Sequence, residues 1–406
     1  MDANPCIGAH SRPLFLQFGA GNIGRSLAGA IFSRAGYDVV FADAADVLVN
    51  ALRERGEYKV VVKGDLPPGQ PAETIVRPVT AFNNVKEPAA LEDAVLRADL
   101  IGTAVGAHVI PLVMKAIAPI LAKRERPVSI IFCENLHGIA EAARGYLAEA
   151  MPEGAAIDGR IGLVATSIGK MVPVMPAEVR ERDPIEVWGE AYNTIIADRN
   201  AFVGPIPEIE GLELHGNFAA YVDRKLYIHN LGHAVCACLG ARRGHRLVCD
   251  AIEDPDVYAT TRAAMMESAM ALMKRYPGEF TEAGQTGHVD DLLRRFRNRA
   301  LGDTVFRVGR DIGRKLADGD RFIGALRLVK EAGGDTRPVC RGIAAALLFD
   351  ATDADGRPYP SDPEILDRVR EVGPVRFLRE FSKLDPEAFA IELREIDAAY
   401  RAFKGQ

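Results

Sequence analysis

Short apolar runs alternate with longer amphipathic stretches over the first half of the chain. Four of the apolar runs have the length of β-strands: 14–18, 38–42, 100–103 and 128–133. Three stretches between them carry apolar residues at helical spacing: 23–35, 45–55 and 111–124. Residues 129–132 are apolar almost throughout, as in a strand buried on both faces. Strands that alternate with helices predict a doubly wound, Rossmann-type parallel sheet.

The rest of the chain departs from this alternation in two ways. Residues 58–79 form two extended runs around a Pro/Gly-rich turn, which predicts an inserted hairpin, and further extended runs lie at 161–164 and 185–189. After about Pro207, helical patterns dominate to the C-terminus. We therefore predict an α/β protein with a dinucleotide-binding domain over residues 12–200 and a mostly α-helical substrate domain over residues 201–406.

Composition narrows the class of protein. A chain of 406 residues is long enough for two cores. A net charge of −6 favours neither nucleic acid nor a membrane surface as a partner, so we expect a small-molecule substrate and a monomer or small homo-oligomer. The N-terminus lacks the pattern of a secretory signal, and no run is apolar enough to span a bilayer, which predicts a cytoplasmic protein. Six scattered cysteines are expected to be reduced and buried, with no metal site: Cys6, Cys133, Cys236, Cys238, Cys249 and Cys340.

A glycine motif follows the first predicted strand and opens the first predicted helix: Gly19-Ala20-Gly21-Asn22-Ile23-Gly24. In this context Gly19 allows a tight turn, Gly21 lets the backbone approach a pyrophosphate, and Gly24 allows the helix to pack closely on the strand. The second predicted strand ends at Asp43, whose carboxylate suits an adenosine ribose diol and repels a 2′-phosphate. The motif therefore predicts NAD as the cofactor, although such a turn also occurs in folds that bind another nucleotide or none.

Two neighbouring segments extend this cofactor site. Residues 102–106 end a strand at the same edge of the sheet, so Val105 is expected beneath the nicotinamide. Arg25 follows the last glycine, where it either approaches a phosphate or faces solvent.

A polar face lies on the predicted long helix 217–243. Lys225, Asn230 and His233 fall within an arc of roughly 140° if the helix is regular. A dehydrogenase without a metal needs a base for the hydroxyl proton and donors for the reacting oxygen. A buried lysine, an asparagine and a histidine suit these roles. Each also has an ordinary structural explanation: a solvated lysine, a helical amide and a buried histidine.

The segment Lys225-Leu226-Tyr227-Ile228-His229-Asn230-Leu231-Gly232-His233 resembles the K-x4-N-x2-H signature of the polyol-specific long-chain dehydrogenases. The likeness extends from the glycine motif and Asp43 through Cys133-Glu134-Asn135 to Arg307-Val308-Gly309-Arg310 and Arg314-Lys315-Leu316. The resemblance implies Lys225 as general base, Asn230 and Asn135 as hydrogen-bond partners of the reacting oxygen, His233 as a substrate contact, and no zinc. Glu134, beside Asn135, is expected to contact the cofactor. Within the family, the chain is most similar to enzymes that oxidise mannitol 1-phosphate.

Two positions depart from the family pattern. Residues 168–173 read Ile-Gly-Lys-Met-Val-Pro where the family usually has Val-Asp-Arg before an apolar-x-Pro. Gly169 removes a carboxylate, and Lys170 lacks the planar fork of arginine, so the identity of the substrate is open. His229 replaces an apolar residue, either as an added polar contact or as a side chain at the solvent edge of the helix.

Basic residues near position 310 suggest a site for a phosphate. Arg307, Arg310 and Arg314 are spaced to line one helical face, with Lys315 adjacent. The alternative is a solvated face on which these cations pair with Asp303, Asp311 and Asp318.

The residues together predict an NAD-dependent oxidoreductase that interconverts a sugar alcohol phosphate and a keto-sugar phosphate, mannitol 1-phosphate and fructose 6-phosphate. The same machinery would also serve a free polyol, a hexuronate or a sugar–amino-acid conjugate. A protein that senses NAD without turnover is the alternative from another class.

Overall fold

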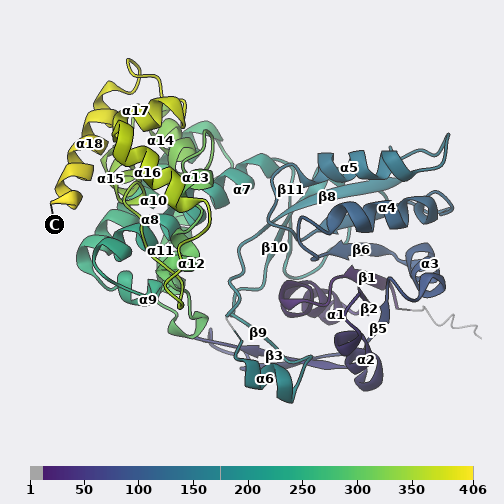
Figure 1. Cartoon of the computed structure of the whole chain (residues 1–406). Helices are drawn as coiled ribbons and strands as arrows, with labels where there is room; N and C mark the ends of the chain where they lie inside the picture. The colour runs from purple at the N-terminus through teal and green to yellow at the C-terminus, as the bar shows by residue number, and fades with distance from the viewer. Residues whose placement is uncertain (1–11, 174, 406) are drawn as a thin grey trace, which may run out of the picture. The chain divides into compact units, whose positions relative to one another are not determined.

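The computed structural model describes residues 12–173 and 175–405, so Cys6 and most of the N-terminal segment lie outside the described residues. The chain divides into two units, one ending at Phe218 and the other beginning at Ala219 (Figure 1). The five described cysteines are buried and unpaired, as expected for reduced packing residues. No helix among the described residues has the length and apolar character needed to cross a membrane.

An eight-stranded sheet forms the centre of the first unit. In spatial order its strands are β11 (Leu212–His215), β10 (Ile195–Asp198), β8 (Ile161–Ile168), β7 (Val128–Phe132), β6 (Leu100–Thr103), β1 (Leu14–Phe18), β2 (Asp38–Asp43) and β5 (Val79–Asn83). The six strands from β5 to β8 are parallel and follow the Rossmann order 3-2-1-4-5-6, while β10 runs antiparallel to β8. The predicted doubly wound sheet is confirmed.

Helices cover both faces of this sheet. They are α1 (Ala30–Arg34), α2 (Asp46–Arg55), α3 (Pro88–Arg97), α4 (Ile110–Leu121) and α5 (Ile139–Ala150), with a π-helical turn, η1 (Gly24–Gly29), before α1. Two apolar cores result, one beneath η1, α1 and α2 and the other beneath α3, α4 and α5. β7 is buried throughout because helices pack on both of its sides, as its continuous apolar run predicted.

A second, three-stranded sheet contains the predicted hairpin. β3 (Tyr58–Val62) pairs with β4 (Glu73–Val76) in antiparallel register, and β9 (Val187–Gly189) joins the other side of β3. The short elements α6 (Ala177–Arg182) and η2 (Arg199–Ala201) complete this unit. Strand β11 lies beyond the expected limit of the first domain at residue 200. β11 has only four residues, and Glu and His alternate with its leucines, so its sequence signal is weak.

Within its described part, the second unit consists of helices joined by loops, with one isolated β-bridge between Leu247 and Thr304. Its elements are α7 (Phe218–Arg224), the π-helical η3 (Lys225–Asn230), α8 (Leu231–Arg242), α9 (Val248–Ala251), α10 (Pro255–Arg275), α11 (Glu282–Phe296), η4 (Arg299–Leu301), α12 (Val305–Gly309), α13 (Ile312–Lys315), α14 (Arg321–Glu331), α15 (Arg337–Ala346), α16 (Asp362–Val372), α17 (Pro374–Glu380) and α18 (Ala390–Lys404).

Helix α8 lies at the centre of this unit, in contact with α9, α10, α12 and α15. It is buried along nearly its whole length, because small residues let its neighbours approach closely. A β-carbon on Gly232 would collide with the Met265 side chain, and one on Gly342 of α15 would lie 2.7 Å from Cγ2 of Val235. The chemistry-bearing residues at the start of α8 are therefore held by a rigid, close-packed helix.

Candidate active site

The glycine turn of the first unit has the geometry that a dinucleotide needs. Gly19 has a φ of +88°, and a β-carbon there would lie 2.5 Å from the carbonyl oxygen of Ala104. A β-carbon on Gly24 would collide with the carbonyl of Gly19. Packing explains both of these glycines. A β-carbon on Gly21, in contrast, would meet no heavy atom within 4 Å, so close approach of a ligand explains this glycine better than packing does.

Asp43 connects the glycine turn to the end of β2. One carboxylate oxygen accepts a 2.7 Å hydrogen bond from the Ala20 N–H, and the other accepts from the Ala45 N–H at 2.9 Å. Each oxygen has a second lone pair, so the carboxylate can still accept from a ribose diol. The predicted cofactor residues Gly19 to Gly24 and Asp43 therefore lie together at the carboxyl edge of the sheet.

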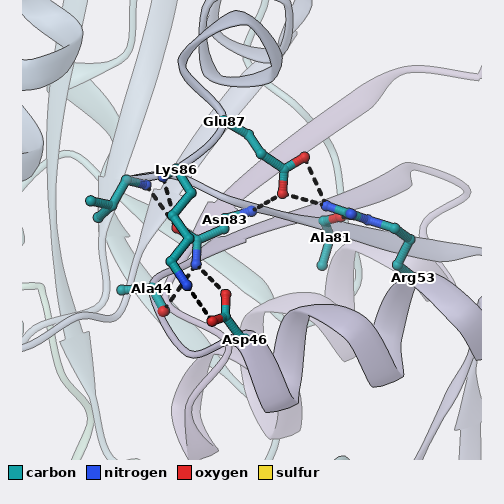
Figure 2. Close-up of polar contacts among 8 residues, drawn as sticks. Ala44, Asp46, Arg53, Ala81, Asn83, Lys86 and Glu87 are labelled. Atoms are coloured by element: carbon teal, nitrogen blue, oxygen red, sulfur yellow. Dashed lines mark hydrogen bonds and ion pairs between the residues drawn. The ribbon is translucent and has the colours of Figure 1, made fainter.

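A polar network beside Asp43 was not anticipated from the sequence (Figure 2). The buried Asn83, at the end of β5, donates to the Ala44 carbonyl at 3.1 Å and to Asp46 at 2.7 Å, and it accepts two backbone N–H bonds. Lys86 also contacts Asp46, and Glu87 binds Arg53 at 2.7 Å (Figure 2). Hydrogen bonds from Lys86 and Asn83 lower the pKa of Asp46. The network fixes the loops after β2 and β5.

Glu134 joins the ends of β6 and β7. Its carboxylate accepts from the Thr103 hydroxyl at 2.6 Å and from the Val105 N–H at 2.9 Å, while burial raises its pKa. Cγ1 of Val105 lies 3.1 Å from the position of a Gly19 β-carbon, so Val105 does lie against the glycine turn. Asn135 is exposed immediately after Glu134.

Arg25 takes neither of the places expected for it. Its side chain is buried, and its Nε donates to the Ala20 carbonyl at 2.6 Å. The Tyr58 hydroxyl in turn donates to the Arg25 carbonyl at 2.7 Å. Arg25 thus supports the glycine turn from within the protein.

The unusual pair Gly169-Lys170 lies at the end of β8. The Lys170 Nζ donates to the carbonyls of Glu190 at 3.0 Å and Tyr192 at 2.8 Å. A β-carbon on Gly169 would lie 3.5 Å from the Tyr192 ring, an ordinary contact. Lys170 therefore ties two segments of the first unit together.

In the second unit, the helix that carries Lys225, Asn230 and His233 is not regular. Residues Lys225–Asn230 form a π-helical turn, and the Leu231 N–H bonds the Leu226 carbonyl five residues earlier. This wider turn brings residues five apart onto one side of the helix, so Lys225 and Asn230 align more closely than the predicted 140° arc. The expectation of one regular helix was therefore wrong. The apolar positions of this segment fit a regular helix almost as well, so the sequence pattern did not reveal the π turn.

The electrostatic environment of Lys225 favours its neutral form. Burial, with repulsion from Arg321, lowers its pKa to about 8. About a tenth of such lysines are neutral at pH 7, whereas an ordinary lysine is almost wholly protonated. This buried amine can accept a proton near neutral pH.

His233 lies one turn beyond Asn230, at the start of α8. Its ring stacks on Phe296 with 4.7 Å between centroids and 10° between planes. Burial, with repulsion from Arg307 and Arg321, lowers its pKa to about 3, so the imidazole is neutral near pH 7. Its Nε2 is buried 3.6 Å from a carboxylate oxygen of Asp303.

His229 is buried rather than solvent-facing. Its ring centroid lies 6.1 Å from that of His233 and 6.0 Å from that of Phe296. Burial and the nearby Arg295 lower its pKa well below the usual value. The second of the two expectations for His229, a side chain at the solvent edge, was therefore wrong.

A cationic pocket of about 330 Å³ contains the predicted phosphate residues. Its lining residues are His233, Arg307, Val308, Arg310, Asp311, Arg314, Lys315, Arg321 and Tyr359. The expectation that the arginines share one helical face was wrong, because α12 ends at Gly309 and Asp311 has a φ of +65°. The basic residues meet instead around the break between α12 and α13.

The alternative pairing with aspartates holds in part. Arg307 contacts Asp303, and Arg314 pairs with Asp311 at 2.6 Å. Asp318 pairs with Arg327 instead. Arg310 has its guanidinium over the rings of Phe306 and Tyr359, 5.7 and 5.5 Å from their centroids. Burial, with repulsion from Arg321 and Arg314, lowers the pKa of Lys315 to about 8.

Three of the residues around this pocket were not singled out from the sequence as parts of a site. Arg321 begins α14 and Tyr359 lies in the loop before α16, both far along the chain from α12. Asp303 has a local signal, since it precedes Arg307 by four residues. No group of three or more His, Cys, Asp or Glu residues is placed to hold a metal ion within residues 12–173 and 175–405.

Known proteins place the chain in a family. A model of the mannitol dehydrogenase Rossmann domain matches residues 14–211, and a model of the mannitol dehydrogenase C-terminal domain matches residues 217–379. The fold is similar to that of a D-sorbitol dehydrogenase, with a TM-score of 0.74 and 17% identity over 96% of this chain and 95% of that one. It is also similar to the mannitol 2-dehydrogenase of Pseudomonas fluorescens, solved with NAD and D-mannitol, with a TM-score of 0.69 and 17% identity over 98% and 92% of the two chains. The two matched domains cover most of the sequence, and the chain belongs to the mannitol dehydrogenase family.

Proposed function

We propose that the protein is an NAD-dependent oxidoreductase that transfers hydride reversibly between a sugar alcohol phosphate and a keto-sugar phosphate. The pair that fits best is mannitol 1-phosphate and fructose 6-phosphate. One observation carries the choice of a phosphorylated substrate: His233, a candidate substrate contact, lines the same pocket as five basic side chains. The family membership and the glycine turn support NAD as the cofactor.

Bound NAD supplies the acceptor for the hydride that leaves the carbinol carbon. Lys225, in its neutral form, takes the hydroxyl proton, and in the reverse direction its ammonium returns the proton to the carbonyl oxygen. A pKa of about 8 gives the lysine useful populations of both forms near neutral pH.

Asn230 is assigned to the reacting oxygen of the substrate, and His233 to a neighbouring hydroxyl. The π turn places the Asn230 amide on the side of the helix that carries Lys225, where its N–H₂ can donate to the oxygen as charge develops there. His233 remains neutral near pH 7, so it can donate from one ring nitrogen and accept at the other. We assign it to a hydroxyl of the substrate.

The charge of the pocket favours an anionic group on the substrate. Arginine side chains bind phosphate oxygens with paired donors. Burial lowers the pKa of Lys315, and repulsion from Arg321 and Arg314 lowers it further; an anion in the pocket would relieve that repulsion. A phosphate with nearly two negative charges gains most from this arrangement.

A second candidate substrate is a hexuronate. Arg307 and Arg314 already contact Asp303 and Asp311, which reduces the charge left for a ligand. A single carboxylate would match this smaller charge. The names of the two similar solved proteins, sorbitol and mannitol dehydrogenases, keep a free polyol as a third possibility.

The test is oxidation of NADH by the purified protein with fructose 6-phosphate, fructose, fructuronate and tagaturonate in parallel. We expect fructose 6-phosphate to have the highest kcat/KM, by about 10²-fold or more over fructose if two arginine contacts are lost. Arg310→Ala should reduce that preference. Arg376→Ala, in a surface pocket elsewhere in the second unit, serves as the matched control. A higher kcat/KM with a uronate or with fructose would reject the phosphorylated substrate.

A further inference from the structure

Three side chains of the second unit form a continuous chain from the cationic pocket to the catalytic helix. Arg307 lines the pocket and contacts one oxygen of the Asp303 carboxylate. The other carboxylate oxygen lies 3.6 Å from Nε2 of His233. Asp303 is 6% exposed, so this carboxylate faces its two neighbours rather than water.

The ring of His233 is held in place while its Nε2 lacks a hydrogen bond. Stacking on Phe296 restricts the plane of the ring. Nε2 is buried and has no hydrogen-bond partner among the described residues. Its separation from Asp303 exceeds an ordinary N–H···O bond by only about 0.5 Å, which a small side-chain rotation can close.

We propose that Asp303 is a positioning residue that fixes the tautomer of His233, and that Arg307 couples this pair to an anionic group of the substrate in the cationic pocket. The carboxylate selects the tautomer with a proton on Nε2. Nδ1 is then the acceptor that the imidazole offers. This step rests on the proposed function only for its link to the substrate.

Arg307 can bind Asp303 and an anionic group in the pocket at the same time, because a guanidinium carries five N–H donors in a fixed fork. One edge contacts Asp303, and the remaining donors are available to phosphate or carboxylate oxygens in the pocket. An anion that orders Arg307 therefore also orders Asp303 and His233. Binding of a group remote from the reacting carbon would in this way raise kcat as well as affinity.

The charges around His233 show why the tautomer needs a specific partner. Arg307, Arg321, Arg295 and Lys315 surround it, and His229 lies beside it. These four cations and the neutral imidazole of His229 disfavour a second proton on the His233 ring. They do not favour either ring nitrogen as the site of its one proton. Asp303 is the carboxylate that the structure places at Nε2, and it makes that choice.

The first test reads the tautomer directly and needs no turnover. Nitrogen-15 NMR of the full chain with labelled histidine distinguishes a protonated from an unprotonated ring nitrogen, and His233→Gln identifies the signals. We expect Nε2–H in the wild type and a shift toward Nδ1–H in Asp303→Asn. Asp256→Asn, which alters a carboxylate paired with Arg341, should leave the tautomer unchanged. An Nδ1–H wild type, or no change in Asp303→Asn, overturns the proposal.

The second test uses kinetics on the preferred substrate of the wild type. Asp303→Asn should lower kcat by about 10²-fold or more with a small change in KM, because an amide no longer enforces the tautomer. Asp256→Asn should change kcat less than about twofold. A loss that appears equally in both variants would mean that Asp303 is merely structural.

The third test separates the role of Arg307. In Arg307→Gln, Asp303 loses its cation and attracts a proton to His233, so the pKa of His233 should rise toward its ordinary value of about 6.5. The kcat of Arg307→Gln should then decrease at pH values below this pKa. In the double variant, Arg307→Gln with Asp303→Asn, this decrease should be absent. A pH profile unchanged by Arg307→Gln would overturn the coupling. Failure to reduce any sugar would reject the proposed function, while the NMR result would still decide the role of Asp303.

Discussion

The candidate cofactor site of the first unit and the candidate catalytic residues of the second are built in different ways. In the first, three polar side chains have internal partners: Asp43 accepts two backbone N–H bonds, Glu134 is tied to Thr103 and Val105, and the Asn83 amide donates two bonds and accepts two (Figure 2). In the second, burial and like charge leave Lys225 and His233 with strongly lowered pKa values. A cofactor site can be built from backbone conformation and satisfied hydrogen bonds. Proton transfer, in contrast, needs groups whose charged forms are destabilised, so that their pKa values are shifted.

The largest effect should come from Lys225→Met, which removes the proposed base and keeps a similar side-chain volume. We expect kcat to fall by about 10³-fold or more. We also expect the variant to be more stable at pH 7. A lysine with a lowered folded-state pKa weakens the fold at every pH below about 8, and this cost disappears only as the pH rises from about 8 toward 10.5.

Steady-state kinetics and thermal unfolding measure both parts of this prediction, with the exposed Lys274→Met as control. The gain in stability should be on the order of 2 kcal/mol. A variant that loses activity and also loses stability would show that Lys225 is a structural lysine, and the contrast between the units would fail.

Two glycine variants sharpen the description of the first unit. Gly24→Ala should unfold this unit or lower its stability by about 2 kcal/mol or more, because the new β-carbon meets the Gly19 carbonyl. Gly21→Ala should keep the wild-type stability and weaken NADH binding by about tenfold, because only a bound pyrophosphate approaches that position. Calorimetry and NADH fluorescence titration separate the two results. Unchanged NADH affinity in Gly21→Ala would contradict the assigned cofactor site.

A smaller effect is expected from pH. With Lys225 as the proposed base, polyol oxidation should need its neutral form, so kcat should rise about tenfold per pH unit below 8 and level off above it. Ketose reduction requires the ammonium and should fall above pH 8. Since the pKa of His233 is lowered to about 3, its titration adds no limb between pH 5 and 9. The kcat values of both directions over this range check the prediction, and parallel profiles in the two directions would contradict it.

The sequence was most informative where function depends on neighbours along the chain. The turn from Gly19 to Gly24 and the acid at Asp43 have fixed spacings because one strand, one turn and one helix set their geometry. β5, which begins where the predicted hairpin ends, was not recognised, and neither were β10 and β11, because these strands have only four or five residues. Strands this short give too few alternating positions to identify.

The pocket of the second unit was predictable only in part. Arg307, Arg310, Arg314 and Lys315 were identified by charge, but the break at Asp311 changed how they meet. Arg321 reaches the pocket from another helix, and no local pattern predicts that contact. The π turn was also missed, since the apolar positions of α7 and α8 fit a regular helix almost as well.

The π turn makes the number of residues in this helix a functional quantity. A π turn contains one residue more than the α-helical turn it replaces. A regular helix of the same length would rotate Lys225 by about 100° around the axis relative to His233, whereas the π turn absorbs one residue and keeps the alignment of a helix one residue shorter. Substitutions within this segment change the chemistry of single groups, while straightening the turn at constant length would keep every group and lose their alignment.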